Sequence, residues 1–136
     1  MKEARNIVDQ FSMLGIALFF LVLSASSNAQ VIDIPQSELM QRITEHRAGL
    51  ILDVRSTEEY AEGHIPGAIN IPHDQLSSRL AEIGAHKNKE IVLYCRSGRR
   101  VGIAADILQA AGFNRLLHLA GDMSGWLGNG NLPIKK

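Results

Sequence analysis

The amino-acid sequence predicts an α/β fold, a single domain with a central, mostly parallel sheet of about five strands and helices on both faces of that sheet. Two observations lead to this prediction. Short apolar runs alternate along the chain with longer segments of helical composition, and several of these runs are apolar at consecutive positions. Strands that are covered on both faces show such runs, and a chain that alternates strands with helices builds parallel sheets.

Residues 1–29 are expected to precede this domain as a signal peptide. A short charged start at residues 1–5 is followed by an apolar run at residues 11–23 and then by small residues up to Ala29, after which cleavage is expected. The alternative is an uncleaved membrane anchor, but the run is shorter than the roughly 20 apolar residues that span a bilayer. We therefore expect an exported, periplasmic protein with no stable membrane association after cleavage.

Residues 30–136 are expected to form the single domain, with strands and helices alternating in chain order. A weak strand at residues 31–34, expected at a sheet edge, leads into a helix at residues 35–47, because Pro35 suits a first helical turn. A buried strand at residues 50–54 and a short helix at residues 57–61 come next.

The second half of the domain repeats this alternation. Strands are predicted at residues 68–71, 91–94 and 116–119, and helices at residues 74–83 and 100–111. Gly112 is typical of the residue that follows the last turn of a helix. Each predicted helix lies between two predicted strands, as parallel connections require.

The overall composition narrows the possible functions. The chain has 14 Lys and Arg and 14 Asp and Glu, so its formal net charge is zero and nucleic-acid binding is not expected. Its single cysteine cannot form an intramolecular disulfide. No metal site is expected, because metal-ligand spacing is absent from the five histidines, which are His46, His64, His73, His86 and His118.

The single cysteine, Cys95, stands where a buried strand is predicted to end and a helix to begin. Such a turn points several backbone N–H groups at one spot and adds the positive end of the helix dipole. Gly98 permits a backbone conformation that other residues resist. The charged residues between positions 91 and 105 are Arg96, Arg99 and Arg100. Positive charge favours the thiolate but also weakens it as a nucleophile, so the loop is better explained as a site that binds anions.

Several segments of the chain resemble those of rhodanese domains. Residues 95–100 resemble the six-residue active-site loop of that family. Segments that resemble its other signatures are residues 52–55, 59–60, 63–72 and 119–121, together with Trp126. The chain is similar to the small exported members of the periplasmic phage-shock type. One departure is Asp122, where many members have a second glycine, and it concerns a turn near the mouth of the pocket.

The resemblance implies a sulfurtransferase in which Cys95 is the nucleophile and carries sulfane sulfur as a persulfide. It implies that the sulfur and its donor are bound by the loop residues Arg96, Ser97, Gly98, Arg99 and Arg100. The implied donor is thiosulfate or a similar anion, and the implied acceptor is a thiophile such as cyanide or a protein thiol. Neither a metal nor an organic cofactor is implied.

Three residues outside the loop are further candidates for lining a pocket. Asp53 and Arg55 directly follow a buried strand, although a pair of this kind more often caps a helix and ties loops together. Trp126 is expected to pack in the core or to form a pocket wall. His64, beside Pro66, is expected in a turn and not in catalysis.

Two other functions remain as alternatives. Cysteine phosphatases and arsenate reductases also place a thiolate in an anion-binding loop, but they have five residues between the cysteine and an arginine. That position is Val101 here, and the arginine stands one residue earlier at Arg100, which favours sulfur over a larger tetrahedral anion. The second alternative is a non-catalytic rhodanese-like binding module, and such modules commonly lack the cysteine.

Overall fold

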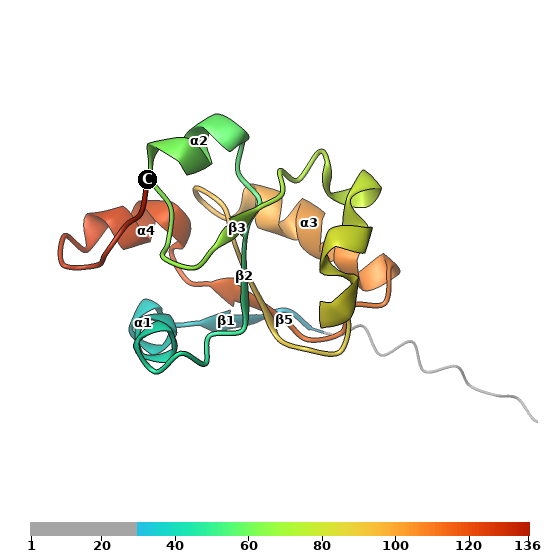
Figure 1. Ribbon diagram of the computed structural model, residues 1–136, viewed down its shortest axis with the longest axis horizontal. Helices are drawn as coiled ribbons and strands as arrows, with labels where there is room; N and C mark the ends of the chain where they lie inside the picture. Colours follow the sequence, from blue (N-terminus) through green and yellow to red (C-terminus); the bar gives the residue numbers. More distant parts are fainter. Residues whose placement is uncertain (1–29) are drawn as a thin grey trace, which may run out of the picture.

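The computed structural model describes residues 30–136, and these form one five-stranded sheet (Figure 1). The strands are β1 (Ile32–Ile34), β2 (Leu50–Asp53), β3 (Ile69–Asn70), β4 (Ile91–Tyr94) and β5 (Leu116–Leu119). Their order across the sheet is β1-β5-β4-β2-β3, and each pair of neighbours runs parallel. The predicted strands are confirmed, with β1 at an edge as expected. Residues 1–29, where the signal peptide is predicted, lie outside the described residues.

Helices cover both faces of the sheet, as the consecutive apolar runs predict (Figure 1). One face packs against α3 (Arg99–Ala110) and the two 3-10 helices η1 (Leu76–Ser78) and η2 (Leu80–His86). The other face packs against α1 (Gln36–Thr44) and α4 (Asp122–Gly128), with α2 (Thr57–Glu62) at the same side. Within residues 30–136, no helix is both long and apolar enough to cross a membrane.

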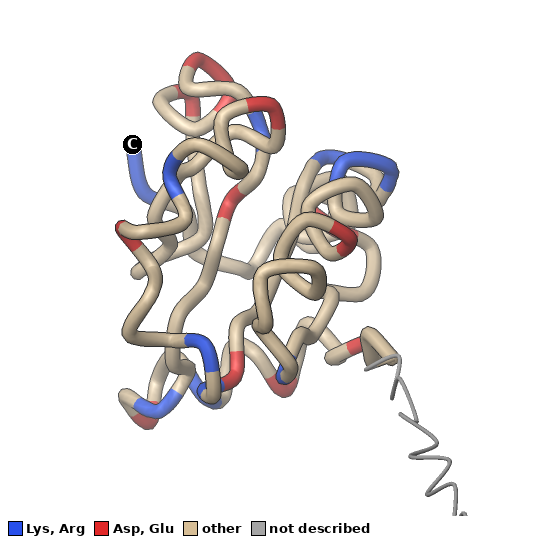
Figure 2. The backbone as a smooth tube through the Cα atoms, turned by 90° about the vertical axis from the view of Figure 1, so that its right-hand side faces the viewer, with Lys and Arg blue, Asp and Glu red and all other residues tan. Residues whose placement is uncertain are grey.

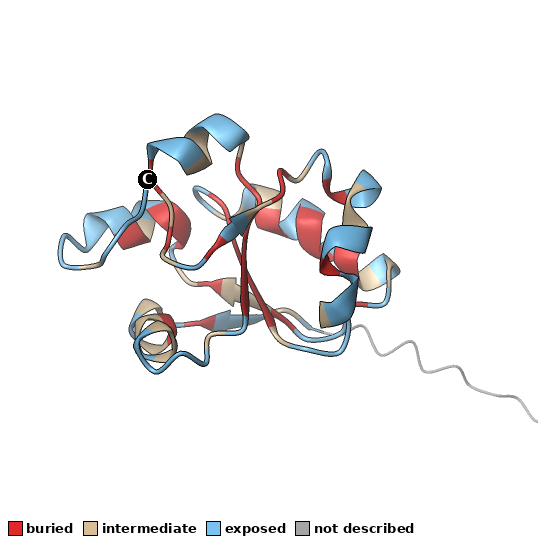
Figure 3. Ribbon diagram, in the orientation of Figure 1, coloured by how far each residue is buried: buried red, intermediate tan, exposed pale blue. Residues whose placement is uncertain are grey.

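The two central strands, β2 and β4, are buried at every position, and side chains on successive residues face opposite sides. Leu52 and Leu93 point to the layer that contains α3, whereas Ile51 and Val92 point to the layer that contains α1 and α4. Figure 3 shows this burial at the centre of the domain, with the exposed residues on the outer helices and connections. Lys and Arg are interspersed with Asp and Glu along the backbone (Figure 2).

Two local predictions need correction. The helix expected at residues 74–83 consists of the two 3-10 helices, because Ser78 bonds its hydroxyl to the carbonyl of Gln75 and competes with regular helical bonding. The helix α4 was not predicted, because Gly125 and Gly128 both disfavour a helix. A Cβ at Gly125 would lie 2.5 Å from the side-chain nitrogen of Gln36, so this glycine allows α4 to approach the start of α1 closely.

The order of the strands separates two connections of the chain at the carboxyl ends of β2 and β4. From β2 the chain moves outward to β3, whereas from β4 it moves in the opposite direction to β5. The connections that leave the ends of β2 and β4 therefore diverge, although these two strands are neighbours. Open α/β sheets bind ligands at such a point, outside the carboxyl ends of the strands. Cys95 directly follows β4 and so lies at the carboxyl ends of the strands, between these two connections.

Candidate active site

Cys95 begins the short loop that joins β4 to α3. Gly98 is the N-cap of α3 and has a φ of 106°, a conformation that favours glycine. In this conformation its N–H group donates to the Cys95 Sγ at 3.0 Å. The thiol is almost completely buried, with 1% of the residue exposed. The loop thus turns the sulfur inward, over the positive end of α3.

Other N–H groups of the loop remain available for a bound anion. Within residues 30–136, no acceptor contacts the N–H groups of Arg96, Ser97, Arg99 and Arg100. Unpaired N–H groups in a loop that carries a thiol can bind negative charge, because each can donate a charge-assisted hydrogen bond. The role of these residues in binding an anion stays a prediction.

The opposite side of the loop is held by the first turn of α4. The Cys95 N–H donates to Asp122 Oδ1 at 3.0 Å. The N–H of Met123 donates to the Cys95 carbonyl at 2.9 Å, and the N–H of Ser124 donates to the Arg96 carbonyl at 3.1 Å. These three bonds fix the peptide groups on both sides of Cys95. Asp122 was not among the predicted site residues, although the position stood out as a departure from glycine.

Asp53 and Arg55 form a buried ion pair at the end of β2, with 0% and 5% of the residues exposed. Asp53 Oδ1 accepts from the backbone N–H of Arg55 at 2.9 Å, and Asp53 Oδ2 accepts from the guanidinium at 2.6 Å. The same guanidinium nitrogen donates to the carbonyl of Gly63 at 2.8 Å. The pair therefore ties the end of β2 to the turn before β3. The helix that follows, α2, is capped instead by Ser56 and Glu59.

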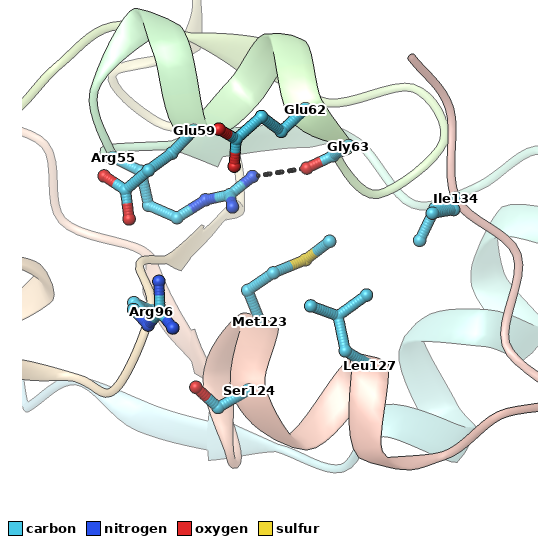
Figure 4. A pocket seen from close by; sticks show the side chains of 9 residues that line it. All are labelled: Arg55, Glu59, Glu62, Gly63, Arg96, Met123, Ser124, Leu127 and Ile134. Carbon is cyan, nitrogen blue, oxygen red and sulfur yellow. Dashed lines mark hydrogen bonds between the residues drawn. The ribbon is translucent and has the colours of Figure 1, made fainter.

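A pocket of about 280 Å³ adjoins the loop (Figure 4). Its lining residues are Arg55, Glu59, Glu62, Gly63, Arg96, Met123, Ser124, Leu127 and Ile134. Figure 4 shows α2 on one side of this space and α4 on the other, with the Arg55 guanidinium between them. Of the three further candidates from the sequence, Arg55 lines the pocket, whereas Asp53 and Trp126 are not among its lining residues.

With this geometry in place, the comparisons with known proteins decide the family. The model of the rhodanese-like domain matches residues 35–129, which is most of the chain. The chain belongs to the rhodanese-like domain family. The match includes the loop after β4 and the first turn of α4 that holds it.

Individual relatives and solved structures agree with this assignment. A sulfurtransferase of Allochromatium vinosum is 36% identical over 102 residues, which cover 75% of this chain and 92% of that protein. The thiosulfate sulfurtransferase PspE of Escherichia coli is 37% identical over 70 residues, which cover 52% of this chain and 67% of that protein. A crystal structure of a protein from Lactobacillus plantarum has a TM-score of 0.67 and 28% identity, covering 77% of this chain and 88% of that chain.

The three arginines of the rhodanese loop have different surroundings. Arg100 forms two hydrogen bonds to the carboxylate of Glu59, at 2.6 and 2.9 Å. These bonds lower the pKa of Glu59 from its ordinary value of 4.5 to about 2. Arg96 and Arg99 are exposed, and within the described part of the chain neither contacts a carboxylate. The positive charge that remains free to attract an anion therefore belongs to Arg96 and Arg99.

Trp126 and His64 hold the C-terminal segment beside the pocket. Trp126 is fully buried in the layer with α1 and donates its indole N–H to the Pro133 carbonyl at 2.8 Å. His64 and Lys135 exchange two backbone hydrogen bonds, at 2.8 and 2.9 Å. Ile134 lies between these anchors and lines the pocket. Trp126 thus packs in the core and does not line the pocket. It affects the pocket indirectly, because it holds the C-terminal segment that carries Ile134.

The ion pair between Glu59 and Arg100 predicts a pH-dependent contribution to stability. Because folding lowers the pKa of Glu59 from 4.5 to about 2, this contribution is present above pH 4.5 and is lost as the pH falls towards 2. Glu59→Gln should lower the free energy of unfolding by about 1 kcal/mol at neutral pH and by much less at the lowest pH. Urea unfolding of both proteins measures this difference, with the exposed neighbour variant Glu58→Gln as control. An equal difference at both pH values would contradict the assignment.

Proposed function

We propose that this rhodanese-like protein is a sulfurtransferase that carries sulfane sulfur as a persulfide on Cys95. The observation that carries the proposal is that the Cys95 loop donates one N–H group to the sulfur and leaves several others unpaired. Gly98 already donates to Sγ, and four further N–H groups of the same loop have no acceptor within residues 30–136. A persulfide extends the side chain by one S–S bond of about 2.05 Å and carries negative charge at its outer sulfur. Unpaired N–H groups around that position would stabilise it.

The proposed reaction has two steps with thiosulfate as the donor. The Cys95 thiolate attacks the outer sulfur of thiosulfate, the S–S bond of the donor breaks, and sulfite leaves with the bonding electron pair. In the second step a nucleophile such as cyanide or a thiolate attacks the outer persulfide sulfur and restores the Cys95 thiolate. Both steps bring two anions together, so hydrogen-bond donors and cations around the sulfur reduce their repulsion.

The binding of the donor is assigned mainly to Arg96, with Arg99 adding to the attraction. Arg96 lines the pocket and is exposed, and its charge is not shared with a carboxylate in the described residues. A guanidinium suits an oxyanion such as the sulfonate end of thiosulfate because its N–H groups match two oxygens at once. Arg100 is assigned a structural role, since Glu59 already occupies its guanidinium.

The acceptor is proposed to be larger than cyanide, a protein thiol being the best fit. The pocket of about 280 Å³ is far larger than a diatomic anion such as cyanide needs. One side of it is apolar, formed by Met123, Leu127 and Ile134. Leu127 and Ile134 are 56% and 41% exposed, so apolar surface faces the entrance. Apolar surface of this kind favours an organic partner, because contact removes it from water.

The structure of the loop offers no support for a phosphatase or arsenate reductase. The arginine that those enzymes need would stand at position 101, and here Val101, in the first turn of α3, is 3% exposed and packs in the core. A binding module without catalysis is also less consistent with the site, because the thiol is present and accepts the Gly98 N–H. Sulfur transfer uses both the cysteine and the unpaired N–H groups around it.

We further propose that the protein is exported to the periplasm and acts there without stable membrane or nucleic-acid association. The support is the order of residues at the start of the sequence, where an apolar run is followed by small residues up to Ala29. A single cysteine is consistent with this location, since a free thiol in an oxidising compartment is usually a reactive one.

The persulfide is the first prediction from this proposal. After incubation with thiosulfate, the intact mass of the protein should rise by one sulfur atom, and cyanide should remove that sulfur as thiocyanate. Cys95→Ser should show neither the added mass nor the turnover, because a hydroxyl is too weak an acid to supply the attacking anion. Retention of the activity by this variant, or Cys95-dependent hydrolysis of aryl phosphates at a comparable rate, would contradict sulfur transfer.

A second prediction concerns the donor. Arg96→Ala should raise the KM for thiosulfate about tenfold with a much smaller change in kcat, because an exposed charge contributes to binding at the lower end of the usual range. The activity should also fall as salt is added, since salt screens the attraction between a cation and an anion. Arg79→Ala removes a half-buried arginine that pairs with Glu82, and steady-state kinetics of this variant should match those of the unaltered protein. Equal KM values for all three proteins would contradict the assignment of donor binding to Arg96.

Export gives the third prediction. N-terminal sequencing of the protein purified from the periplasmic fraction should begin at Gln30, one residue after the expected cleavage point. Replacing the small residue Ala29 by a bulky one, Ala29→Phe, should slow this processing. Full-length protein found mainly in the membrane fraction would indicate an anchor instead.

A further inference from the structure

A row of hydrogen bonds runs beneath the Cys95 loop through side chains from three elements. Asp122 of α4 accepts the Cys95 N–H with Oδ1, and its other oxygen, Oδ2, lies 3.0 Å from His118 Nε2 in β5. The second ring nitrogen of His118, Nδ1, lies 3.0 Å from Asp33 Oδ1 in β1. One imidazole thus bridges two carboxylates, and one of these carboxylates directly holds the backbone of Cys95.

The carboxylate nearest to the loop is buried, and the exposure increases along the row. The side chains of Asp122, His118 and Asp33 are 4%, 22% and 68% exposed. The loop lies directly against this row, since a Cβ at Gly98 would be 3.3 Å from Asp122 Oδ2 and 3.7 Å from the His118 ring. Gly98 is also the residue whose N–H bonds to the Cys95 Sγ. The carboxylate and the sulfur are therefore on two sides of the same short loop.

This position of Asp122 creates an electrostatic conflict that His118 can remove. A buried carboxylate disfavours a second negative charge nearby, and the thiolate and the persulfide of Cys95 are both negative. His118 donates from both ring nitrogens only when it is protonated, and both nitrogens face carboxylate oxygens. Protonated His118 and ionised Asp122 together carry no net charge. With this pair neutral and Arg100 paired with Glu59, the unbalanced charges of the loop are those of Arg96 and Arg99.

We propose that Asp122 and His118 are positioning residues of this site: Asp122 fixes the Cys95 peptide, and the His118 cation offsets the Asp122 charge so that negative sulfur can form in the loop. The proposal adds to the sulfur transfer proposed above, but its first test does not require turnover. Other charged or titratable groups lie in the loop itself and in the neighbouring elements: Arg96, Arg99 and Arg100 from the loop and α3, Glu59 from α2, Asp53 and Arg55 from the end of β2, and Tyr94 from β4. Of these, Arg100 pairs with Glu59 and Arg55 with Asp53.

The first test is the pH dependence of the alkylation of Cys95 by iodoacetamide, an uncharged reagent that reacts with the thiolate. Cys95 is the only cysteine, so the reaction reports on this site alone. His118→Gln keeps a hydrogen-bond donor beside Asp122 but removes the cation, so the pH midpoint of alkylation should rise by about one unit. Adding Asp122→Asn to this variant removes the opposing charge, and the midpoint should return to that of the unaltered protein. His86→Gln is the control for loss of a histidine elsewhere and should leave the midpoint unchanged.

The two outcomes of this test differ clearly. A rise in His118→Gln that the double variant reverses supports the charge compensation. An unchanged midpoint in His118→Gln, or a rise that persists in the double variant, would overturn it, because the effect would then not depend on the Asp122 charge. Circular dichroism of each variant confirms that the fold is kept. Because alkylation needs no sulfur donor, a protein that failed to take sulfur from thiosulfate would still give a decisive result.

The hydrogen bond from the Cys95 N–H is tested by two substitutions at one position. Asp122 has a φ of 53°, so Asp122→Gly relieves the backbone while it removes the acceptor. Asp122→Asn keeps an oxygen that accepts the Cys95 N–H. We expect kcat to fall about tenfold or more in Asp122→Gly with little change in KM, and expect a substantially smaller loss in Asp122→Asn. Unchanged kcat in Asp122→Gly would overturn the positioning role.

Discussion

The parallel pairing of β2 with β4 at the centre of the sheet determines where the functional side chains lie. Asp53 is paired with Tyr94, so the carboxyl ends of the two strands lie side by side. The residues that follow each strand therefore begin at the same place. From there the chain continues to β3 on one side and to β5 on the other, which separates the two connections. Arg55 from the first connection and Arg96 from the second consequently line one pocket. The apolar faces of both strands keep this pairing fixed, because each is buried between two layers of helices.

The charges near the sulfur fall into two groups with different physical roles. Arg55 and Arg100 are each bound by a carboxylate and tie separate segments of the chain together. Their charges are largely balanced, so they attract a further anion weakly. Arg96 and Arg99 are exposed and contact no carboxylate in the described residues. In the transfer proposed from thiosulfate, this division would serve both steps, because the balanced pairs give rigidity and the free cations give attraction without excessive retention of the product.

The geometry of the loop depends on the last part of the chain as much as on the loop itself. The first turn of α4 holds the peptide groups around Cys95, and α4 is in turn fixed by Trp126, which is buried and bonded to Pro133. The same C-terminal segment brings Ile134 to the pocket. Packing in the core is therefore transmitted to the sulfur through α4, and a substitution at Trp126 would disturb both the pocket wall and the orientation of the loop.

The sequence alone determined the α/β fold, the five strands and the loop of Cys95, because apolar runs and a glycine before a helix act over a few neighbouring residues. It did not indicate α4, since Gly125 and Gly128 argue against a helix that tertiary packing nevertheless stabilises. Only the tertiary structure determined that Arg100 forms an ion pair, because its partner Glu59 is 41 residues away in the chain. The hydrogen bond between the Cys95 N–H and Asp122 spans 27 residues and likewise could not be predicted from the sequence. Local conformational preferences depend on adjacent residues, whereas the partner of a charged group depends on which elements the folded core brings together.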